Sequence, residues 1–448
     1  MEDFMSRTYS PAKLSLAIWF SALALAFGAQ EMSATTTVTY IVGTCKSGTQ
    51  FSTIQSALDA SPAPDTVEVC PGQYGEQLTI TKPVTLEGIT AANGALAQIM
   101  PGSTGLNVNA HVFGGDQPVV AQVYVDHVTG GNVNLTNLNV NGMNQNAGGT
   151  SPTFFVGILY EQSSGTINQV VTSSQNGMYD VGYGILIEGG SSDPSVTVEN
   201  SSIYEFTGGY GGDGIYAIGG STATAPDLTV TIKNNFISSP PPTTGAPSSY
   251  NLVVEQFTDP TVSGNVVNGG LVGIYVDTPK GSITGNSLFG SLSGILITSP
   301  DDTAEEGTGL TVSGNTVVGS QYGIQLLADG PSVTSNNILN SGVDGIEVDL
   351  LGGVTLHTST VENNTIKTVQ LGAGTGIELN CNTVSSSLVH SNTMMDSYSG
   401  YGDAPAGFSG SNTYLGVISD VTPCTSESVS RKASAAPRPK LLGQLRGQ

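Results

Sequence analysis

Short runs of alternating apolar and polar residues repeat along most of the chain. The phrase Gly-Ile-x-Val, or a close variant of it, begins at Gly157, Gly184, Gly214, Gly273, Gly294, Gly323, Gly345 and Gly376. The shortest spacing is 21 residues, and wider spacings contain polar insertions rich in Gly and Pro. A degenerate copy, Asn251-Leu252-Val253-Val254, fills the widest gap. A constant minimum spacing with variable insertions indicates stacked structural units that carry loops at particular corners.

A second repeated phrase places alternating apolar residues on both sides of an Asn. The Asn residues are Asn265, Asn286, Asn315, Asn336, Asn364 and Asn392. Alternation is strand periodicity, and Asn tolerates the left-handed backbone conformation that a tight corner requires. Stacked Asn side chains can also hydrogen-bond to one another as a ladder.

These two phrases predict an all-β chain that forms a right-handed parallel β-helix, with about three strands per coil. We expect the solenoid to run from about residue 40 to about residue 420, within a domain of residues 30–424, with the six Asn side chains at one corner. A left-handed β-helix would show strict hexapeptide repeats, which this chain lacks.

The N-terminal end of the predicted solenoid carries a helix pattern in the stretch FSTIQSALDA. Ser52 and Gln55 have the spacing of a capping box, and Phe51, Ile54 and Leu58 fall on one helical face. We therefore predict a short amphipathic helix that covers the open end of the core.

Both ends of the chain differ from the repeats. Basic residues precede an apolar run over residues 14–27, and small residues follow it, so residues 1–29 predict a secretory signal peptide. The run is short for a membrane span. The expected location is therefore extracellular, periplasmic or at the cell surface. Residues 425–448 are basic and lack periodicity, which predicts a disordered tail.

The four cysteines form two pairs near the two ends of the mature chain. An even number of cysteines in a secreted protein favours disulfides. We predict the pairs Cys45–Cys70 and Cys381–Cys424, one at each end of the solenoid. Each could stabilise the fold by ~3–4 kcal/mol in the chain-entropy model.

The charge of the chain is strongly negative. The formal net charge is −23, and no Arg occurs between Arg7 and Arg431. Such a surface repels nucleic acid and anionic membranes but suits neutral polymers and divalent cations. We expect a monomer with no transmembrane segment in the mature chain.

The stretch at residues 51–89 resembles the opening of right-handed β-helix proteins of the pectin-lyase-like superfamily. Within it, Gly72-Gln73-Tyr74-Gly75-Glu76 resembles the GxYxE pattern of pectin methylesterases. The repeats extend the resemblance over nearly the whole mature chain, and it implies the fold. It implies no specific activity, because the further motifs of methylesterases and polygalacturonases and the arginine base of pectate lyases are absent.

One outward face of the predicted coils carries most of the candidate chemistry. If the Ile of each Gly-Ile-x-Val phrase points inward, the next residue and the one two positions later point outward. These positions include Glu161, Glu188, Tyr216, Glu255, Tyr275, Asp277, Glu347, Asp349, Glu378 and Asn380. In the enzymes that the chain resembles, this face forms the substrate groove. A plainer interpretation is that these carboxylates only keep an acidic solenoid soluble.

Glu255 and Asp277 are the predicted catalytic pair. They occupy one outward column on consecutive coils, so their Cα atoms should lie about 5 Å apart. That separation suits the nucleophile and acid/base of a retaining glycosidase, and one of the two pKa values should rise. Tyr216 and Tyr275 are predicted to bind sugar rings, with Glu188 and Lys280 as further substrate-binding residues.

A calcium site is predicted further along the same face. Glu347, Asp349, Glu378 and Asn380 form an outward rectangle of oxygen-bearing side chains, which suits a hard cation. The four histidines share no column and no metal-ligand spacing, so we interpret them as surface or turn residues. Asp213 and Asp344 each precede a Gly-Ile phrase, which favours turn capping.

Three functions remain open from the sequence. The first is a secreted carbohydrate-active enzyme, a glycoside hydrolase that acts on an extracellular polysaccharide. The second is a non-catalytic polysaccharide-binding or cell-surface protein. The third is a calcium-dependent polysaccharide lyase with Lys280 as base. Neither the polysaccharide nor the bond follows from the sequence.

Overall fold

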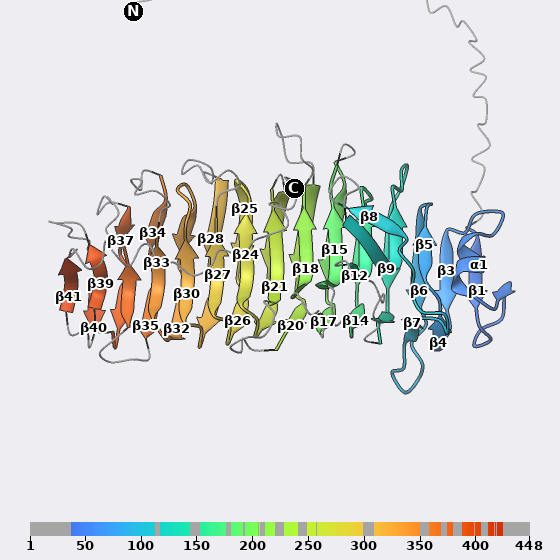
Figure 1. Cartoon of the computed structure of the whole chain (residues 1–448), viewed down its shortest axis with the longest axis horizontal. Coiled ribbons are helices and arrows are strands. Elements are labelled where there is room, and N and C mark those ends of the chain that lie inside the picture. The colour runs from blue at the N-terminus through green and yellow to red at the C-terminus, as the bar shows by residue number, and fades with distance from the viewer. Residues whose placement is uncertain are drawn as a thin grey trace, which may run out of the picture. The chain divides into compact units, whose positions relative to one another are not determined.

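A computed structural model describes most of the chain between residues 37 and 423. The described residues are 37–112, 117–143, 153–175, 181–190, 193–204, 206, 211–219, 228–240, 249–256, 258–298, 309–349, 358–368, 374–379, 388–397, 399–404, 411–415, 417 and 419–423. Almost all of the regular structure is β-strand, arranged in three long sheets whose strands, apart from β2 and β8, follow one another in chain order (Figure 1).

The first sheet contains 14 strands. In spatial order they are β2 (Gln50–Phe51), β1 (Thr39–Val42), β3 (Thr66–Val69), β6 (Val84–Gly88), β10 (Val133–Thr136), β13 (Gly165–Asn168), β16 (Ser195–Glu199), β19 (Leu228–Lys233), β22 (Thr258–Ser263), β25 (Lys280–Thr284), β28 (Gly309–Ser313), β31 (Ser332–Thr334), β34 (Thr360–Glu362) and β37 (Val389–His390).

The second sheet contains 13 strands. They are β4 (Gly72–Gly75), β7 (Ala97–Met100), β11 (Leu138–Asn141), β14 (Val171–Ser173), β17 (Ser202–Tyr204), β20 (Phe236–Ser238), β23 (Val266–Asn268), β26 (Ser287–Phe289), β29 (Thr316–Val318), β32 (Asn337–Ser341), β35 (Thr365–Thr368), β38 (Thr393–Met395) and β40 (Thr413–Leu415).

The third sheet also contains 14 strands and carries the Gly-Ile phrases. They are β5 (Leu78–Ile80), β9 (Gln117–Asp126), β12 (Phe154–Glu161), β15 (Val181–Glu188), β18 (Gly212–Ile218), β21 (Ser249–Glu255), β24 (Val272–Asp277), β27 (Ser293–Ile297), β30 (Tyr322–Leu326), β33 (Asp344–Val348), β36 (Thr375–Glu378), β39 (Ser399–Ala404) and β41 (Ser419–Pro423), with β8 (Ala110–Val112) antiparallel to β9.

Each coil passes once through each sheet, as β22, β23 and β24 do, and the next coil repeats the path in register. Ile232 pairs with Val262, and Val262 pairs with Ile283, so apolar side chains stack directly above one another. These stacks form one continuous hydrophobic core that runs from Tyr40 to Ala404. Burial of apolar surface in this core provides most of the stability. The prediction of a parallel β-helix with three strands per coil is confirmed.

The Asn residues form a ladder at the corner between the first and second sheets, as predicted, but the left-handed backbone conformation falls on the residue before the Asn, as at Gly264 (φ 64°) and Asn363 (φ 57°). Asn286 Oδ1 accepts hydrogen bonds from both the backbone N–H (3.0 Å) and Nδ2 (2.9 Å) of Asn265. The same pattern links each Asn to the next coil, and the ladder also includes residues that the sequence pattern missed at both ends. Its members are Asn235, Asn265, Asn286, Asn315, Asn336, Asn364, Asn392 and Asn412.

The predicted capping helix is α1 (Ile54–Leu58), and it buries Ile54, Ala57 and Leu58 against the end of the core. The predicted capping box at Ser52 is wrong, because Thr53 is the N-cap and its side chain accepts from the Ser56 N–H. The Glu76 carboxylate accepts from the Ile54 and Gln55 N–H groups (2.8 and 3.0 Å). Helix N-termini favour a negative charge, so the Glu of the GxYxE pattern has a structural role here.

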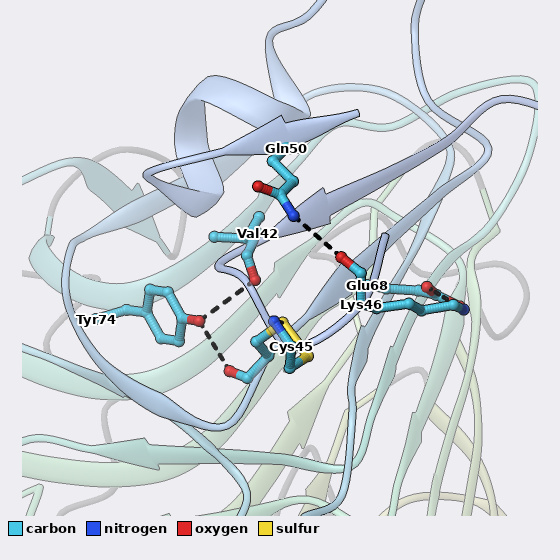
Figure 2. Close-up of a disulfide and its surroundings, with 7 residues drawn as sticks. Val42, Cys45, Lys46, Gln50, Glu68 and Tyr74 are labelled. Atoms are coloured by element: carbon cyan, nitrogen blue, oxygen red, sulfur yellow. Dashed lines mark hydrogen bonds and ion pairs between the residues drawn. A yellow bond between two sulfur atoms is a disulfide. The ribbon is translucent and has the colours of Figure 1, made fainter. Parts of the chain in front are cut away.

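The Cys45–Cys70 disulfide is present, as predicted, beside this cap (Figure 2). The Tyr74 hydroxyl donates to Cys70 O at 2.8 Å and lies close to Val42 O, which ties the second sheet to the first (Figure 2). Cys381 and Cys424 lie outside the described residues, as do the predicted signal peptide and the basic tail. No helix in the described part of the chain has the length and apolar character of a membrane span.

Candidate functional site

The outward positions of the third sheet align as the sequence predicted. Asp126 pairs with Glu161, Glu161 with Glu188, and two coils further on Glu255 pairs with Asp277. Ile218 interrupts this row between Glu188 and Glu255. We call the row Asp126, Glu161, Glu188, Ile218, Glu255 and Asp277 the carboxylate column. The degenerate Asn251 coil keeps its register, so Glu255 points to the same side as Asp277.

Glu255 is almost completely buried, although it lies on the outward side of the third sheet. Its side chain is only 3% exposed, and Tyr216 Oη donates a hydrogen bond of 2.5 Å to Glu255 Oε2. Hydrogen bonds between a neutral hydroxyl and a carboxylate are short and strong, so Tyr216 stabilises the charged form of Glu255. Asp277 is half-buried on the next strand.

Four tyrosines surround this pair: Tyr183, Tyr216, Tyr250 and Tyr275. The ring centroids of Tyr183 and Tyr216 are 5.8 Å apart, and those of Tyr250 and Tyr275 are 6.0 Å apart. All four belong to a second hydrophobic cluster, built on the outward positions of the third sheet. All four rings are buried, so Tyr216 and Tyr275 present no open ring face to solvent for a sugar to stack on.

Asp213 joins the same cluster, which the sequence interpretation as a turn cap did not predict. It is buried, and this burial, together with the negative charge of Glu255, raises its pKa well above the ordinary value. A backbone hydrogen bond from Tyr250 opposes this rise in pKa. Asp213 and Glu255 therefore form a coupled pair in which Asp213 favours the protonated form.

The sequence carries a signal for these additional residues. Tyr183, Asp213 and Tyr250 are register partners, and each stands directly before the Gly or Asn that begins the repeated phrase. The hydroxyls of Tyr183 and Tyr250 are buried and have no hydrogen-bond partner in the described structure. Burial raises the pKa of both tyrosines. The site thus contains the carboxyl groups of Glu255, Asp277 and Asp213. It also contains the hydroxyls of Tyr183 and Tyr250, each of which can still donate a hydrogen bond.

The two remaining predicted substrate-binding residues lie apart from this cluster. Glu188 is half-buried on β15, two coils from Glu255 along the carboxylate column. Lys280 begins β25 in the first sheet, and its Nζ forms an ion pair with Asp259 Oδ2 at 2.6 Å. The polar insertions at residues 219–227, 238–249 and 298–309 lie largely outside the described residues, whereas the insertion at residues 189–195 is described except for residues 191 and 192.

The predicted calcium ligands are described only in part. Glu347 and Glu378 are register partners, and Gln325 Nε2 donates to Glu347 Oε2 at 2.6 Å. Asp349 follows β33, and Asn380 lies outside the described residues. Burial, followed by the charges of Glu378 and Glu347, raises the pKa of nearby Asp344 well above its ordinary value. The calcium site stays a prediction, which calorimetry on a Glu347→Gln/Glu378→Gln variant would test.

Comparison with known proteins gives a clear result for the fold. The family model described as "Right handed beta helix region" matches residues 123–330 and 250–415, which agrees with the predicted handedness and the pectin-lyase-like resemblance. No curated protein matches the chain.

Three solved structures are among those to which the chain is similar. DFA-IIIase from Arthrobacter chlorophenolicus, without its lid, is 13% identical with a TM-score of 0.46, over 83% of this chain and 92% of that chain. An alginate lyase from Paenibacillus sp. is 17% identical with a TM-score of 0.42, over 77% and 97%. XylC in complex with xylose is 10% identical with a TM-score of 0.49, over 84% and 86%. At these values, nothing about the chemistry of this chain follows from them.

Proposed function

Since the chain belongs to the right-handed β-helix family, we propose that it is a secreted carbohydrate-active enzyme whose Glu255 and Asp277 hydrolyse a glycosidic bond. The observation that supports this proposal is the in-register pairing of these two carboxylates on adjacent strands, beside a tyrosine that donates to one of them. Register partners in a sheet lie about 5 Å apart, which is the separation of the two carboxyl groups in retaining glycosidases.

The two carboxylates have different surroundings, and this difference supports a distinct role for each. Tyr216 donates to Glu255 and favours its charged form, so Glu255 acts as the nucleophile that attacks the anomeric carbon. Asp277 is the more exposed of the two and donates a proton to the leaving oxygen. In the second half of the reaction, Asp277 takes a proton from water, and that water releases the sugar from Glu255.

The lyase alternative has less support than the hydrolase. The lyase would require Lys280 as its base. Lys280 forms an ion pair with Asp259 on the first sheet, whereas the carboxylate column lies on the third sheet. The binding-protein alternative has one specific observation in its favour. Glu255 and Tyr216 are almost completely buried. Such burial is expected of polar residues that hold a polysaccharide-binding surface in shape and take no part in a reaction.

The test is a screen of neutral, amino-sugar and uronate polysaccharides, scored for reducing ends and separately for unsaturated-uronate absorbance. We expect reducing ends without unsaturated products, and a loss of at least 10²-fold in Glu255→Gln and Asp277→Asn. Glu199→Gln, which changes a carboxylate of the first sheet, is the matched control and should keep full activity.

Substrates with different leaving groups distinguish the role of Asp277 from the role of Glu255. Asp277→Ala should still cleave aryl glycosides whose leaving group needs no protonation, and added azide should restore its turnover, because azide needs no general base. Glu255→Ala should cleave neither substrate in the absence of azide. Full activity in both Glu255→Gln and Asp277→Asn would refute the hydrolase. Polysaccharide binding without turnover would leave the binding-protein function in its place.

A further inference from the structure

The outward side of the second sheet, which we call the neutral face, differs in charge from the other two sheets. Its thirteen described strands contain no Asp, Glu, Arg or His, and their one charged residue, Lys367, is paired with Asp396 at 3.2 Å. The first sheet, by contrast, contains Glu68, Glu199 and Asp259, and the third contains the carboxylate column. The formal net charge of the chain is −23, so the neutral face is an exception on a strongly acidic protein.

Apolar side chains gather on the neutral face and are open to solvent. Phe236 and Val266 are register partners on β20 and β23, and they are 44% and 39% exposed. Phe289 on β26 is 38% exposed, and its register partner Val318 pairs in turn with Leu339. The outward apolar side chains of the third sheet, in contrast, are buried in the second hydrophobic cluster. Uncovered apolar side chains on five consecutive coils are typical of a surface that contacts a partner.

Neutral polar side chains occupy other outward positions of the same coils. Ser287 and Thr316 are register partners, as are Thr316 and Asn337. This polar row runs beside Phe289 and Val318, two residues earlier on each strand. The core of a protein interface is depleted of charged residues and enriched in aromatic ones, whereas its overall hydrophobicity is ordinary. The neutral face has this composition.

We propose that the neutral face binds the same face of a second copy of the chain, so that the protein forms a dimer with twofold symmetry. Two copies repel one another through their acidic first and third sheets, whereas two neutral faces can approach without that repulsion. Contact between identical faces also limits the assembly to two chains, because each copy covers the other. A dimer replaces the monomer that we expected from the sequence.

The size of the neutral face suits a reversible dimer. Thirteen strands at about 4.8 Å spacing, each about 10 Å long, cover roughly 620 Å² per chain and roughly 1,200 Å² per pair. Specific complexes bury about 1,200–2,000 Å² in total, so the neutral face lies at the lower end of that range. We therefore expect a dimer that dissociates on dilution.

A neutral polysaccharide is the other partner that an uncharged surface could bind. Sugar hydroxyls that lose water against Val266, Val318 and Leu339 would find no hydrogen-bond partner there, which costs free energy. A second apolar surface loses no hydrogen bonds in the same place and gains from the burial of both. The apolar row thus favours the second copy over the polysaccharide.

Sedimentation equilibrium of the full chain measures its mass over a range of protein concentrations. We expect the mass to rise from that of one chain to that of two and to stop there. Added salt should strengthen the dimer or leave it unchanged, because salt screens the repulsion between acidic chains and no ion pair joins the two faces.

Val266→Asp places a carboxylate in the middle of the apolar row and should weaken the dimer at least tenfold, because that charge must lose water against an apolar surface. The matched control is Thr261→Asp, since Thr261 is exposed on β22 of the same coil and belongs to the first sheet. The control adds the same charge and should dimerise as the wild type does. Phe289→Ser removes a ring without adding charge and should also weaken the dimer.

Two checks separate a lost contact from a lost fold or a lost activity. Val266→Asp and Thr261→Asp should unfold at the same temperature at low protein concentration, and if Val266→Asp unfolds earlier, Phe289→Ser decides the test. The proposed hydrolysis is independent of the neutral face, because Glu255 and Asp277 lie on the third sheet. Polysaccharide turnover by Val266→Asp should therefore equal that of the wild type.

The proposal is overturned if the wild type stays monomeric at the highest concentration, if Val266→Asp and Phe289→Ser dimerise unchanged, or if Thr261→Asp loses the dimer to the same extent. A monomeric wild type that binds a neutral polysaccharide, with binding lost in Val266→Asp, would also overturn the dimer and assign the neutral face to that polysaccharide.

Discussion

The Asn ladder and the carboxylate column are both single rows of polar side chains, each with one residue per coil, yet their physical consequences are opposite. An Asn side chain both donates and accepts, so each member bonds to the next coil, and the row is uniform and, except for Asn412 at its end, buried. A carboxylate only accepts, so stacked members repel one another until a hydroxyl, an imidazole or a proton intervenes. The ladder therefore stabilises the fold, whereas the carboxylate column concentrates negative charge on the outer side of the third sheet.

The largest expected effect breaks the ladder. In Asn315→Ala, the Asn286 N–H and Nδ2 lose their shared acceptor, and Ile283 O loses its donor. Each buried group left unsatisfied costs about 1–3 kcal/mol, so we expect a loss of about 3–5 kcal/mol in denaturant-induced unfolding. The exposed Asn268, which lies outside the ladder, provides the control, and Asn268→Ala should change stability by less than about 0.5 kcal/mol. Equal losses in the two variants would contradict the role given to the ladder.

The next effect compares two buried tyrosines of the third sheet. Tyr216→Phe removes the hydrogen bond to Glu255 and should cost about 2 kcal/mol, because the acceptor is charged. Tyr183→Phe removes an equally buried hydroxyl that has no hydrogen-bond partner in the described part of the chain, so it should be neutral or stabilising. Urea unfolding of both variants measures the difference. Similar destabilisation by both would mean that ring packing, and not the Tyr216–Glu255 bond, holds the cluster together.

A smaller effect follows from Asp213 and depends on pH. Burial and the charge of Glu255 raise its folded-state pKa above the unfolded value of 3.8, so the folded protein holds a proton that the unfolded chain has released. Stability from this group is therefore complete below pH 3.8 and declines as the pH rises towards the folded-state pKa, by up to about 1.4 kcal/mol per pH unit. Asp213→Asn should remove this slope and be more stable than the wild type at neutral pH.

Thermal unfolding of the wild type and of Asp213→Asn, followed from pH 3.8 upwards, measures the slope directly. Asp259→Asn serves as the control, because Asp259 is exposed and paired with Lys280. A wild-type slope that persists unchanged in Asp213→Asn would show that another group holds the proton.

The smallest effect concerns an ion pair on the outer side of the first sheet. Lys280 and Asp259 are bonded at 2.6 Å, but their side chains are 42% and 39% exposed. Exposed pairs contribute about 0–1 kcal/mol, so Lys280→Gln should lower stability by no more than that. Polysaccharide turnover should also be unchanged, which separates the hydrolase from a lyase that needs Lys280. A large loss of turnover would restore the lyase.

Much of the outer face could be predicted because its positions follow from a period of two along each strand. The alternation placed Glu255 beside Asp277 and Tyr216 on the same face, and the registers agree. The same rule did not show that Tyr216 would donate to Glu255, because that bond crosses from one column to another. It also left Asp213 as a turn residue, although its carboxyl is coupled to Glu255.

The sequence by itself determined the coil, its three strands and the Asn corner, because each depends on a local pattern that repeats at every turn. It also determined which residues share a column, since registry between coils follows from matching phrases. Only the tertiary structure decided which of those residues are buried, which bond across columns, and that Phe236 and Val266 stay exposed side by side. These properties depend on distances between side chains one coil apart and on the removal of water around them, and no local pattern encodes either one.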